Sequence, residues 1–146
     1  MILERLYKWG RHLPGPPRAL LRLLASRCFE RGGYPLAGPL SVCRMCSATP
    51  LGAYLEGIYE PGATQMITRM VQPRCVCVDV GAHIGYLTLL LAKLVAEDGR
   101  AIALDAHPED AEKVRSNVEI NSYGPRVQVE NMAVSDATCH RVKFSP

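Results

Sequence analysis

The stretch that decides the fold spans residues 75–85 and has the sequence CVCVDVGAHIG. Its first six residues are apolar except for Asp79, and such apolar runs are typical of strands buried on both faces of a parallel sheet. Residues 81–85 contain two glycines and predict a turn. Residues 86–96 follow with leucines at helical spacing, so the segment predicts a strand, a turn and a helix.

The same order of elements continues downstream. Residues 101–105 predict a second buried strand that also ends in an acid, Asp105. Pro108 predicts the start of a helix that stops near Gly124, and residues 127–134 predict a third strand. This βαβαβ pattern indicates an α/β fold with a Rossmann-like, doubly wound parallel sheet. A further helix is expected upstream at residues 64–72, with Met66, Ile67, Met70 and Val71 on one side.

The charge is distributed unevenly along the 146 residues. Residues 1–50 contain eight Lys or Arg and two acids, for a net +6, whereas residues 51–146 contain nine and twelve, for −3. We therefore divide the chain into a basic N-terminal arm, residues 1–50, and a partial Rossmann-like domain, residues 51–146. The arm predicts a short amphipathic helix near residues 18–28 and loops from residue 35 to 58. Peripheral contact with a membrane and packing on the domain are both open for this arm, and no nucleic acid is expected as a partner.

Length and composition exclude several classes of protein. A chain of this size allows one domain, and it has no apolar run near the roughly 20 residues that span a bilayer. The first residues contain no apolar core of a secretory signal. The six cysteines include one CxxC, residues 43–46, without the second pair that a structural zinc site needs, so no metal is expected. Free thiols fit a reducing compartment, and we expect a cytoplasmic protein.

Polar residues stand at the carboxyl end of each predicted strand. Asp79 precedes the turn at residues 81–85, Asp105 ends the second strand, and residues 131–136 include the end of the third. Ligands of open parallel sheets bind beyond the carboxyl ends of the strands, where these residues would meet. A carboxylate at Asp105 can accept hydrogen bonds from both hydroxyls of a ribose. The pattern predicts a cofactor that contains adenosine.

The turn itself indicates which cofactor. A dinucleotide site has the pattern GxGxxG, but here the sequence from Asp79 to Gly85 is DxGxxxG, which is one glycine short. An acid at the end of the strand suits an ammonium group better than a pyrophosphate. This favours S-adenosylmethionine, with its methionyl amino group, over a nicotinamide cofactor. It therefore also argues against a nicotinamide-dependent oxidoreductase.

Several segments together resemble one enzyme family. Residues 77–93 resemble motif I of the FkbM-like methyltransferases, a branch of the class I S-adenosylmethionine-dependent enzymes. Residues 103–110 resemble their ribose-binding segment, residues 131–136 the segment that contacts adenine, and residues 57–61 the usual lead-in. The resemblance implies a cofactor-binding set in which Asp79, Gly81 and Gly85 hold the methionyl part, Asp105 holds the ribose, and Ala133, Val134 and Asp136 lie near the adenine.

Two positions depart from the pattern of that family. His83 stands where the family usually has Asn, and Asp105 stands where it usually has Glu. We include His83 in the cofactor-binding set, and the catalytic residues are not identified. Structural roles also stay open at this stage, since Asp79 could cap the following helix and Gly85 could allow close packing.

The resemblance implies an O-methyltransferase that acts on the hydroxyl of a small molecule. The family fold has more strands than this sequence supplies, so a C-terminally incomplete domain is expected, with residues 141–144 beginning a hairpin. One side of the strand at residues 75–80 would then lack a neighbour. The alternative is a non-catalytic cofactor-binding or interaction module whose sheet a second chain completes.

Overall fold

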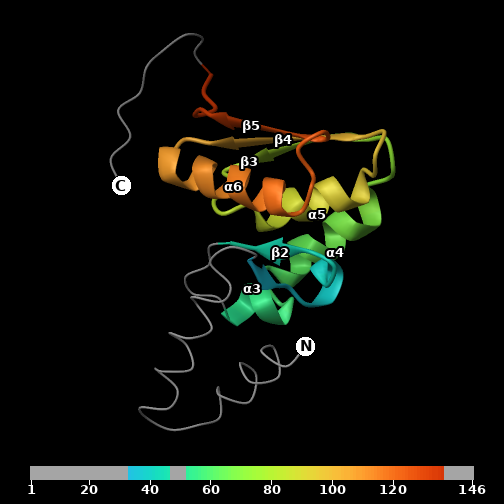
Figure 1. Ribbon diagram of the computed structural model, residues 1–146. Coiled ribbons are helices and arrows are strands. Elements are labelled where there is room, and N and C mark those ends of the chain that lie inside the picture. The colour runs from blue at the N-terminus through green and yellow to red at the C-terminus, as the bar shows by residue number, and fades with distance from the viewer. Residues whose placement is uncertain (1–32, 47–51, 137–146) are drawn as a thin grey trace, which may run out of the picture.

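The computed structural model describes residues 33–46 and 52–136, and its main sheet has three parallel strands (Figure 1). The strands are β3 (Val76–Val80), β4 (Arg100–Asp105) and β5 (Val127–Asn131), in the order β3-β4-β5. The register places Asp79 opposite Ala103 and Asp105 opposite Asn131, so the carboxyl ends meet at one edge. The predicted α/β fold with a parallel sheet is confirmed, although β5 ends three residues earlier than expected.

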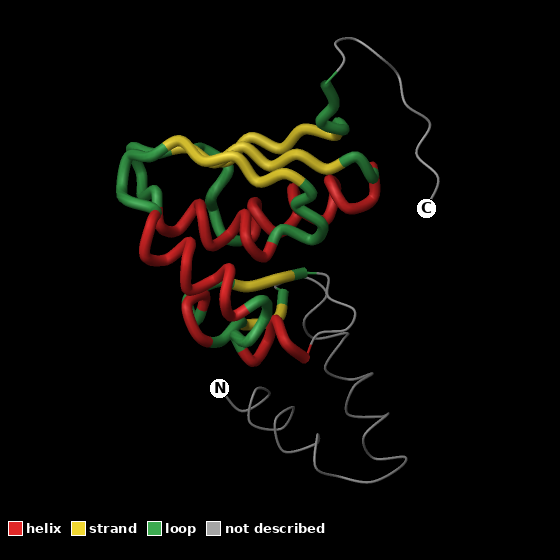
Figure 2. The backbone as a smooth tube through the Cα atoms, turned by 180° about the vertical axis from the view of Figure 1, so that it is seen from behind, coloured by secondary structure: helices red, strands yellow, loops and turns green. Residues whose placement is uncertain are grey.

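The two crossover helices lie on the same face of this sheet. Helix α5 (Tyr86–Leu94) connects β3 to β4, and α6 (Pro108–Ile120) connects β4 to β5. Figure 2 shows both helices in one layer beneath the strands. Ala111, Val114 and Val118 of α6 are buried against the sheet, as predicted. The apolar stripe of α5 divides its contacts between the sheet and the segment that precedes β3.

Strand β3 is buried less than its sequence indicates. We expected both of its faces to be buried, but Val76, Val78 and Val80 are 68%, 54% and 61% exposed. Cys77 and Asp79 face the helices and are partly buried. The three valines point to the other face of the sheet, which no element covers within the described residues. The strand also forms the open edge of the sheet in this part of the chain, as expected.

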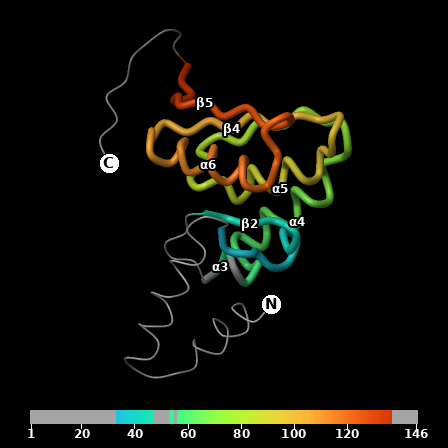
Figure 3. Tube along the Cα trace, in the orientation of Figure 1, coloured from blue at the N-terminus to red at the C-terminus, as the bar shows by residue number. Residues whose placement is uncertain are grey.

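Residues 33–56 contain secondary structure where loops were predicted. Strands β1 (Tyr34–Pro35) and β2 (Arg44–Met45) pair antiparallel around a 3₁₀ turn, η1 (Gly38–Leu40), and α3 spans Gly52–Glu56. Figure 3 shows this segment on the far side of the helices from the sheet. The loop prediction is wrong because these two-residue strands have no periodicity of their own and form by packing on α5 and α6.

Two asparagines at the C-terminal end of α6 attach this segment through partly buried hydrogen bonds. The side chain of Asn117 accepts a hydrogen bond from the backbone N–H of Cys46, at 2.6 Å, and donates one to the carbonyl of Ile84, at 2.8 Å. Asn121 accepts from the N–H of Arg44, at 2.8 Å. Leu40, Cys43 and Met45 are fully buried beside α5. The division of the chain at residue 50 stays a prediction.

Helix α4 (Pro61–Met70) begins and faces differently from the prediction. Met66 and Met70 are 57% and 70% exposed, while Thr64 is buried and Ile67 packs on the core. A threonine can face inward here because its hydroxyl donates to the carbonyl of Tyr59, at 3.0 Å. Of the four residues expected on one side, Ile67 and Val71 therefore pack inward as predicted, whereas Met66 and Met70 do not.

Cys43, Cys46, Cys75 and Cys77 are free thiols. The stretches that the structure describes include no helix that is both long and apolar enough to span a membrane. The predicted amphipathic helix at residues 18–28 and the hairpin at residues 141–144 lie outside the described residues.

Candidate functional site

A cavity of about 260 Å³ lies at the carboxyl end of β3. Three of the predicted site residues line it, namely Asp79, Gly81 and His83. The rest of its lining comes from the turn, from the start of α5 and from residues 54–60, which precede α4. The other lining residues are Tyr54, Tyr59, Glu60, Val80, Ala82, Ile84, Tyr86 and Leu87.

Asp79 lies between β3 and the first turn of α5. Its Oδ2 accepts a hydrogen bond from the hydroxyl of Thr88, at 2.5 Å. Burial raises the pKa of Asp79; the hydrogen bonds from Thr88 oppose this rise, and the negative charges of Asp105 and Glu60 add to it. The carboxylate therefore anchors the start of α5 and also lines the cavity, so the structural and binding roles coexist.

Asp105 ties together two connections at the end of β4. Its Oδ2 accepts from the backbone N–H of His83, at 2.7 Å, and its Oδ1 accepts from the N–H of His107, at 2.8 Å. The residue is only 9% exposed and does not line the cavity. Each carboxylate oxygen has two lone-pair directions, so one on each oxygen remains for a ribose. The ribose assignment stays a prediction.

The turn between β3 and α5 is held by the neighbouring strand. The backbone N–H groups of Gly81 and Ala82 both donate to the carbonyl of Leu104, at 2.9 and 3.1 Å. Gly81 has a φ of +77° and open space where a Cβ would lie, so a ligand can approach its backbone. His83 adopts a φ of +52°, which is uncommon for a residue with a side chain.

Gly85 has a structural reason to be glycine. Its φ is +87°, and a Cβ built on it would lie 3.2 Å from Cγ1 of Val114 on α6. The residue precedes the first residue of α5 and is buried. It allows the turn to pack against α6, and it does not line the cavity.

The predicted adenine contacts lie outside this cavity. Ala133, Val134 and Asp136 follow β5 and are all exposed. The same segment is connected to β4 through Asn131, whose side chain donates to the carbonyl of Asp105, at 2.9 Å. The three residues thus lie at the carboxyl edge of the sheet, but their contact with an adenine stays a prediction.

Eight cavity residues were not among the predicted site residues, and four of these have polar side chains. Tyr54, Tyr59 and Tyr86 form an aromatic cluster, and Glu60 lies beside them. Two of them, Tyr59 and Glu60, could have been found from the sequence, since residues 57–61 resemble the lead-in of a methyltransferase. Nothing local showed that this segment would return to the end of β3.

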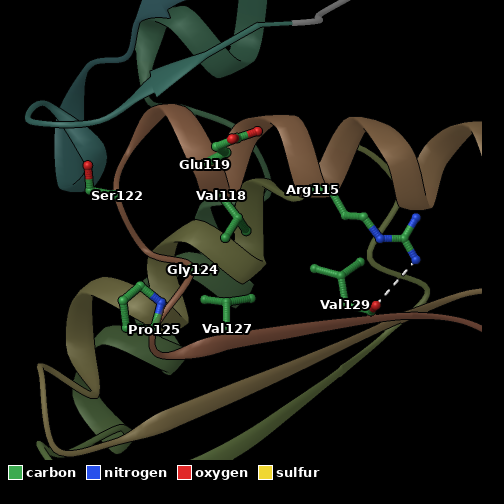
Figure 4. A pocket seen from close by; sticks show the side chains of 8 residues that line it. All are labelled: Arg115, Val118, Glu119, Ser122, Gly124, Pro125, Val127 and Val129. Atoms are coloured by element: carbon green, nitrogen blue, oxygen red, sulfur yellow. Dashed lines mark hydrogen bonds between the residues drawn. The ribbon is translucent and has the colours of Figure 1, made fainter.

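A second hollow lies between α6 and β5 (Figure 4). Its volume is about 440 Å³, and valines form its floor, with Arg115 at one end donating to the carbonyl of Val129, at 3.3 Å. Gly124 and Pro125 place it toward the amino end of β5, away from the carboxyl edge. None of the predicted site residues lines it.

Comparison with known families gives a match that covers the site. The model of the family described as protein-L-isoaspartate(D-aspartate) O-methyltransferase matches residues 58–139. This range includes the cavity turn, both acids and the segment after β5.

Curated relatives match the same part of the chain. The protein-L-isoaspartate O-methyltransferase of Aeropyrum pernix is 38% identical over 82 residues, which are 55% of this chain and 31% of the relative. That of Methanopyrus kandleri is 33% identical over 85 residues, 57% of this chain and 37% of the relative. The chain thus spans about a third of the length of the curated relatives it matches.

Solved structures of methyltransferases also resemble the chain. One titled a putative rRNA-methylase from Clostridium thermocellum has a TM-score of 0.49 and 22% identity, over 50% of this chain and 41% of its own. An S-adenosylmethionine-dependent O-methyltransferase from Thermotoga maritima has a TM-score of 0.47 and 25% identity, over 51% of this chain and 29% of its own.

Proposed function

The chain belongs to the protein-L-isoaspartate(D-aspartate) O-methyltransferase family of S-adenosylmethionine-dependent enzymes, and on that premise we propose that it forms the cofactor-binding part of such a methyltransferase. The observation that supports this most directly is the cavity at the carboxyl end of β3. Asp79 and Glu60 line it, and no lysine or arginine does so among the residues that the structure describes. A cavity with this charge suits the cationic end of S-adenosylmethionine and disfavours a pyrophosphate.

The residues around the cavity fit such a cofactor. The carboxylate of Asp79 is placed to accept from an ammonium group, and the open space above Gly81 lets a ligand reach the backbone. Asp105 holds the turn in place and has free lone pairs for ribose hydroxyls. When bound, S-adenosylmethionine would supply an electrophilic methyl group: an acceptor oxygen would bond to the methyl carbon with one of its lone pairs, and the electron pair of the broken C–S bond would stay on the sulfur.

The group that accepts the methyl is the next part of the proposal. The motifs resemble those of FkbM-like enzymes and implied the hydroxyl of a small molecule, whereas the matching family and relatives are named for isoaspartyl residues. We therefore propose a carboxylate on a protein as the acceptor in place of a small-molecule hydroxyl. Methyl transfer to a carboxylate needs alignment of the acceptor and no strong base, because the oxygen is already ionised at neutral pH.

The test has a binding step and a transfer step. S-adenosylmethionine is titrated into the full 146-residue chain by calorimetry, with NAD as a competitor. We expect saturable binding that NAD does not displace, and tighter binding of NAD would overturn the proposal. Transfer of a labelled methyl group is then measured to an isoaspartyl peptide, to the same peptide with an ordinary aspartyl residue, and to the hydroxyls of a set of sugars. Labelling of the hydroxyls alone would restore the small-molecule acceptor.

One observation favours a second candidate function. The open edge of β3 and the exposed Val76, Val78 and Val80 suit a module whose sheet another polypeptide completes. Such a module would bind S-adenosylmethionine but transfer no methyl group alone. Val78→Lys, on that face, should then abolish assembly with the completing polypeptide and leave cofactor affinity unchanged. The cytoplasmic location inferred from the cysteines stays a prediction.

A further inference from the structure

Three tyrosine rings form one wall of the cavity. The centroids of Tyr54 and Tyr59 are 4.3 Å apart in a stacked arrangement, and the ring of Tyr86 lies 5.6 Å from Tyr54 and 5.2 Å from Tyr59. Tyr54 and Tyr86 are buried, whereas Tyr59 is partly exposed, and all three line the cavity. The faces of such rings are electron-rich and attract cations.

The charges around these rings have one sign. Glu60 and Asp79 line the same cavity, and no lysine or arginine joins them within the described part of the chain. The pKa of Asp79 is raised first by burial, and the charges of Asp105 and Glu60 raise it further against the hydrogen bonds from Thr88. The pKa of Tyr59 is also raised, by burial and then by its neighbours Tyr54 and Glu60, so its ring stays a neutral phenol. A cation in this cavity would meet carboxylates and neutral rings.

One buried hydroxyl in the cavity wall has no hydrogen-bond partner in the part of the chain that the structure describes. The Oη of Tyr86 makes no hydrogen bond with any described residue, although the residue is only 2% exposed. Buried polar atoms are nearly always hydrogen-bonded, so an unsatisfied one beside a cavity points to a ligand that completes it.

The position of Tyr59 and Glu60 is fixed by α4. The backbone N–H of Thr64 donates to the carbonyl of Glu60, at 2.9 Å, and its hydroxyl donates to the carbonyl of Tyr59, at 3.0 Å. Glu60 has a φ of +40°, a left-handed conformation that costs energy in a residue with a side chain. The fold thus holds a strained residue in place at the wall of the cavity.

We infer that Tyr54, Tyr59 and Tyr86 form a cation subsite that recognises the sulfonium charge of the methyl donor and disfavours its neutral thioether product. The inference rests on the proposed function, because it assigns a part of the cofactor to this wall. It makes Tyr59 a specificity-determining residue, since its ring is the most accessible of the three. Loss of the positive charge on methyl transfer would weaken the contact and favour release of the product.

The test compares three ligands on the full chain by calorimetry. S-adenosylmethionine has the sulfonium, S-adenosylhomocysteine is the neutral thioether, and sinefungin has an ammonium in place of the sulfonium. In Tyr59→Leu we expect affinity for the two cationic ligands to fall about tenfold, and affinity for S-adenosylhomocysteine to change less than twofold. Tyr59→Phe retains the ring and should retain most of the preference.

The outcomes separate the inference from the proposed function. A wild-type chain that binds none of the three ligands overturns both. Binding in which Tyr59→Leu weakens all three ligands equally, or none, overturns only the cation subsite. Tyr123→Leu is the matched control, because Tyr123 is also a partly buried tyrosine but lies outside the cavity. An equal change of ligand preference in that variant would trace the effect to general destabilisation and overturn the inference.

Discussion

The Oδ2 atom of Asp105 accepts a hydrogen bond from the backbone N–H of His83, at 2.7 Å, so the end of β4 holds the turn that follows β3. The other carboxylate oxygen accepts from the N–H of His107, at 2.8 Å, at the start of α6. One side chain therefore sets the positions of two connections at the carboxyl edge. Its role in shaping the site is visible without a ligand, and any ribose contact would be added to it.

Replacing Asp105 should destabilise the chain strongly. Asp105→Ala removes two charge-assisted hydrogen bonds and leaves backbone N–H groups without acceptors, so we expect the free energy of unfolding to fall by about 2–4 kcal/mol. Urea denaturation measures this change. Affinity for S-adenosylmethionine, measured where the variant is folded, should fall at least tenfold if the ribose assignment holds.

The control for Asp105 is an acid with a different environment. Asp98 pairs with Arg74 at 3.3 Å, but the two side chains are 71% and 79% exposed. Asp98→Ala should therefore change the free energy of unfolding by less than about 1 kcal/mol. Equal effects of the two substitutions would refute the connecting role of Asp105.

The conformation of His83 predicts a second pattern of stability changes. Its φ of +52° is tolerated by Gly and Asn and disfavoured by β-branched residues. His83→Asn should leave the free energy of unfolding within about 0.5 kcal/mol, whereas His83→Val should lower it by about 1–2 kcal/mol. Thermal melting of the two variants checks the difference. Gln128→Val, in the extended strand β5, is the control, and a loss there as large as at His83 would contradict the backbone explanation.

The elements from residue 76 onward were predictable because their signals are local. Apolar runs, helical periodicity, Pro108 and the glycines placed β3, α5, β4, α6 and β5 in order. The hairpin of β1 and β2 was not predictable, since Asn117 and Asn121 fix it from more than 70 positions away along the chain. The burial of β3 was overestimated for a related reason, because what covers a strand is not encoded in the strand.

The residues of the candidate site were likewise predictable only in part. Asp79, Gly81 and His83 were brought together by a topological rule, since they lie at the carboxyl end of one strand of a parallel sheet. Tyr59 and Glu60 come from a segment whose path depends on α4 and on the hydroxyl of Thr64. Gly85 was correctly expected at the turn, but only the contact with Val114 distinguishes packing from ligand binding.

Gly85 and Gly62 should respond in opposite directions to the same substitution. Gly85→Ala places a Cβ 3.2 Å from Val114 at a φ of +87°, so we expect a loss of about 1–3 kcal/mol in the free energy of unfolding. Gly62 lies inside α4 with open space around its Cα, so Gly62→Ala should stabilise by up to about 1 kcal/mol. Chemical denaturation compares them directly, and a neutral Gly85→Ala would show that the turn can shift away from α6.

Asp79 should make stability fall as the pH rises. Burial raises its pKa in the folded chain above the ordinary value of 3.8, so in the interval between the two values the folded state binds more protons than the unfolded state. The contribution of Asp79 to the free energy of unfolding is therefore largest below pH 3.8 and is lost as the pH rises through the raised pKa. The measurement is the difference between wild type and Asp79→Asn across this interval, which should shift in favour of Asp79→Asn as the pH rises.

Two further experiments test whether the titration of Asp79 affects ligand binding in the cavity. Thr88→Val removes a hydrogen bond that lowers the pKa of Asp79, so it should enlarge the pH dependence. A bound cation favours the ionised carboxylate, so the affinity of wild type for S-adenosylmethionine should increase with pH over the same interval, while that of Asp79→Asn should not. A stability difference that is independent of pH would show that Asp79 is better solvated than its position indicates. A pH-independent affinity ratio would remove Asp79 from the contacts of the ligand.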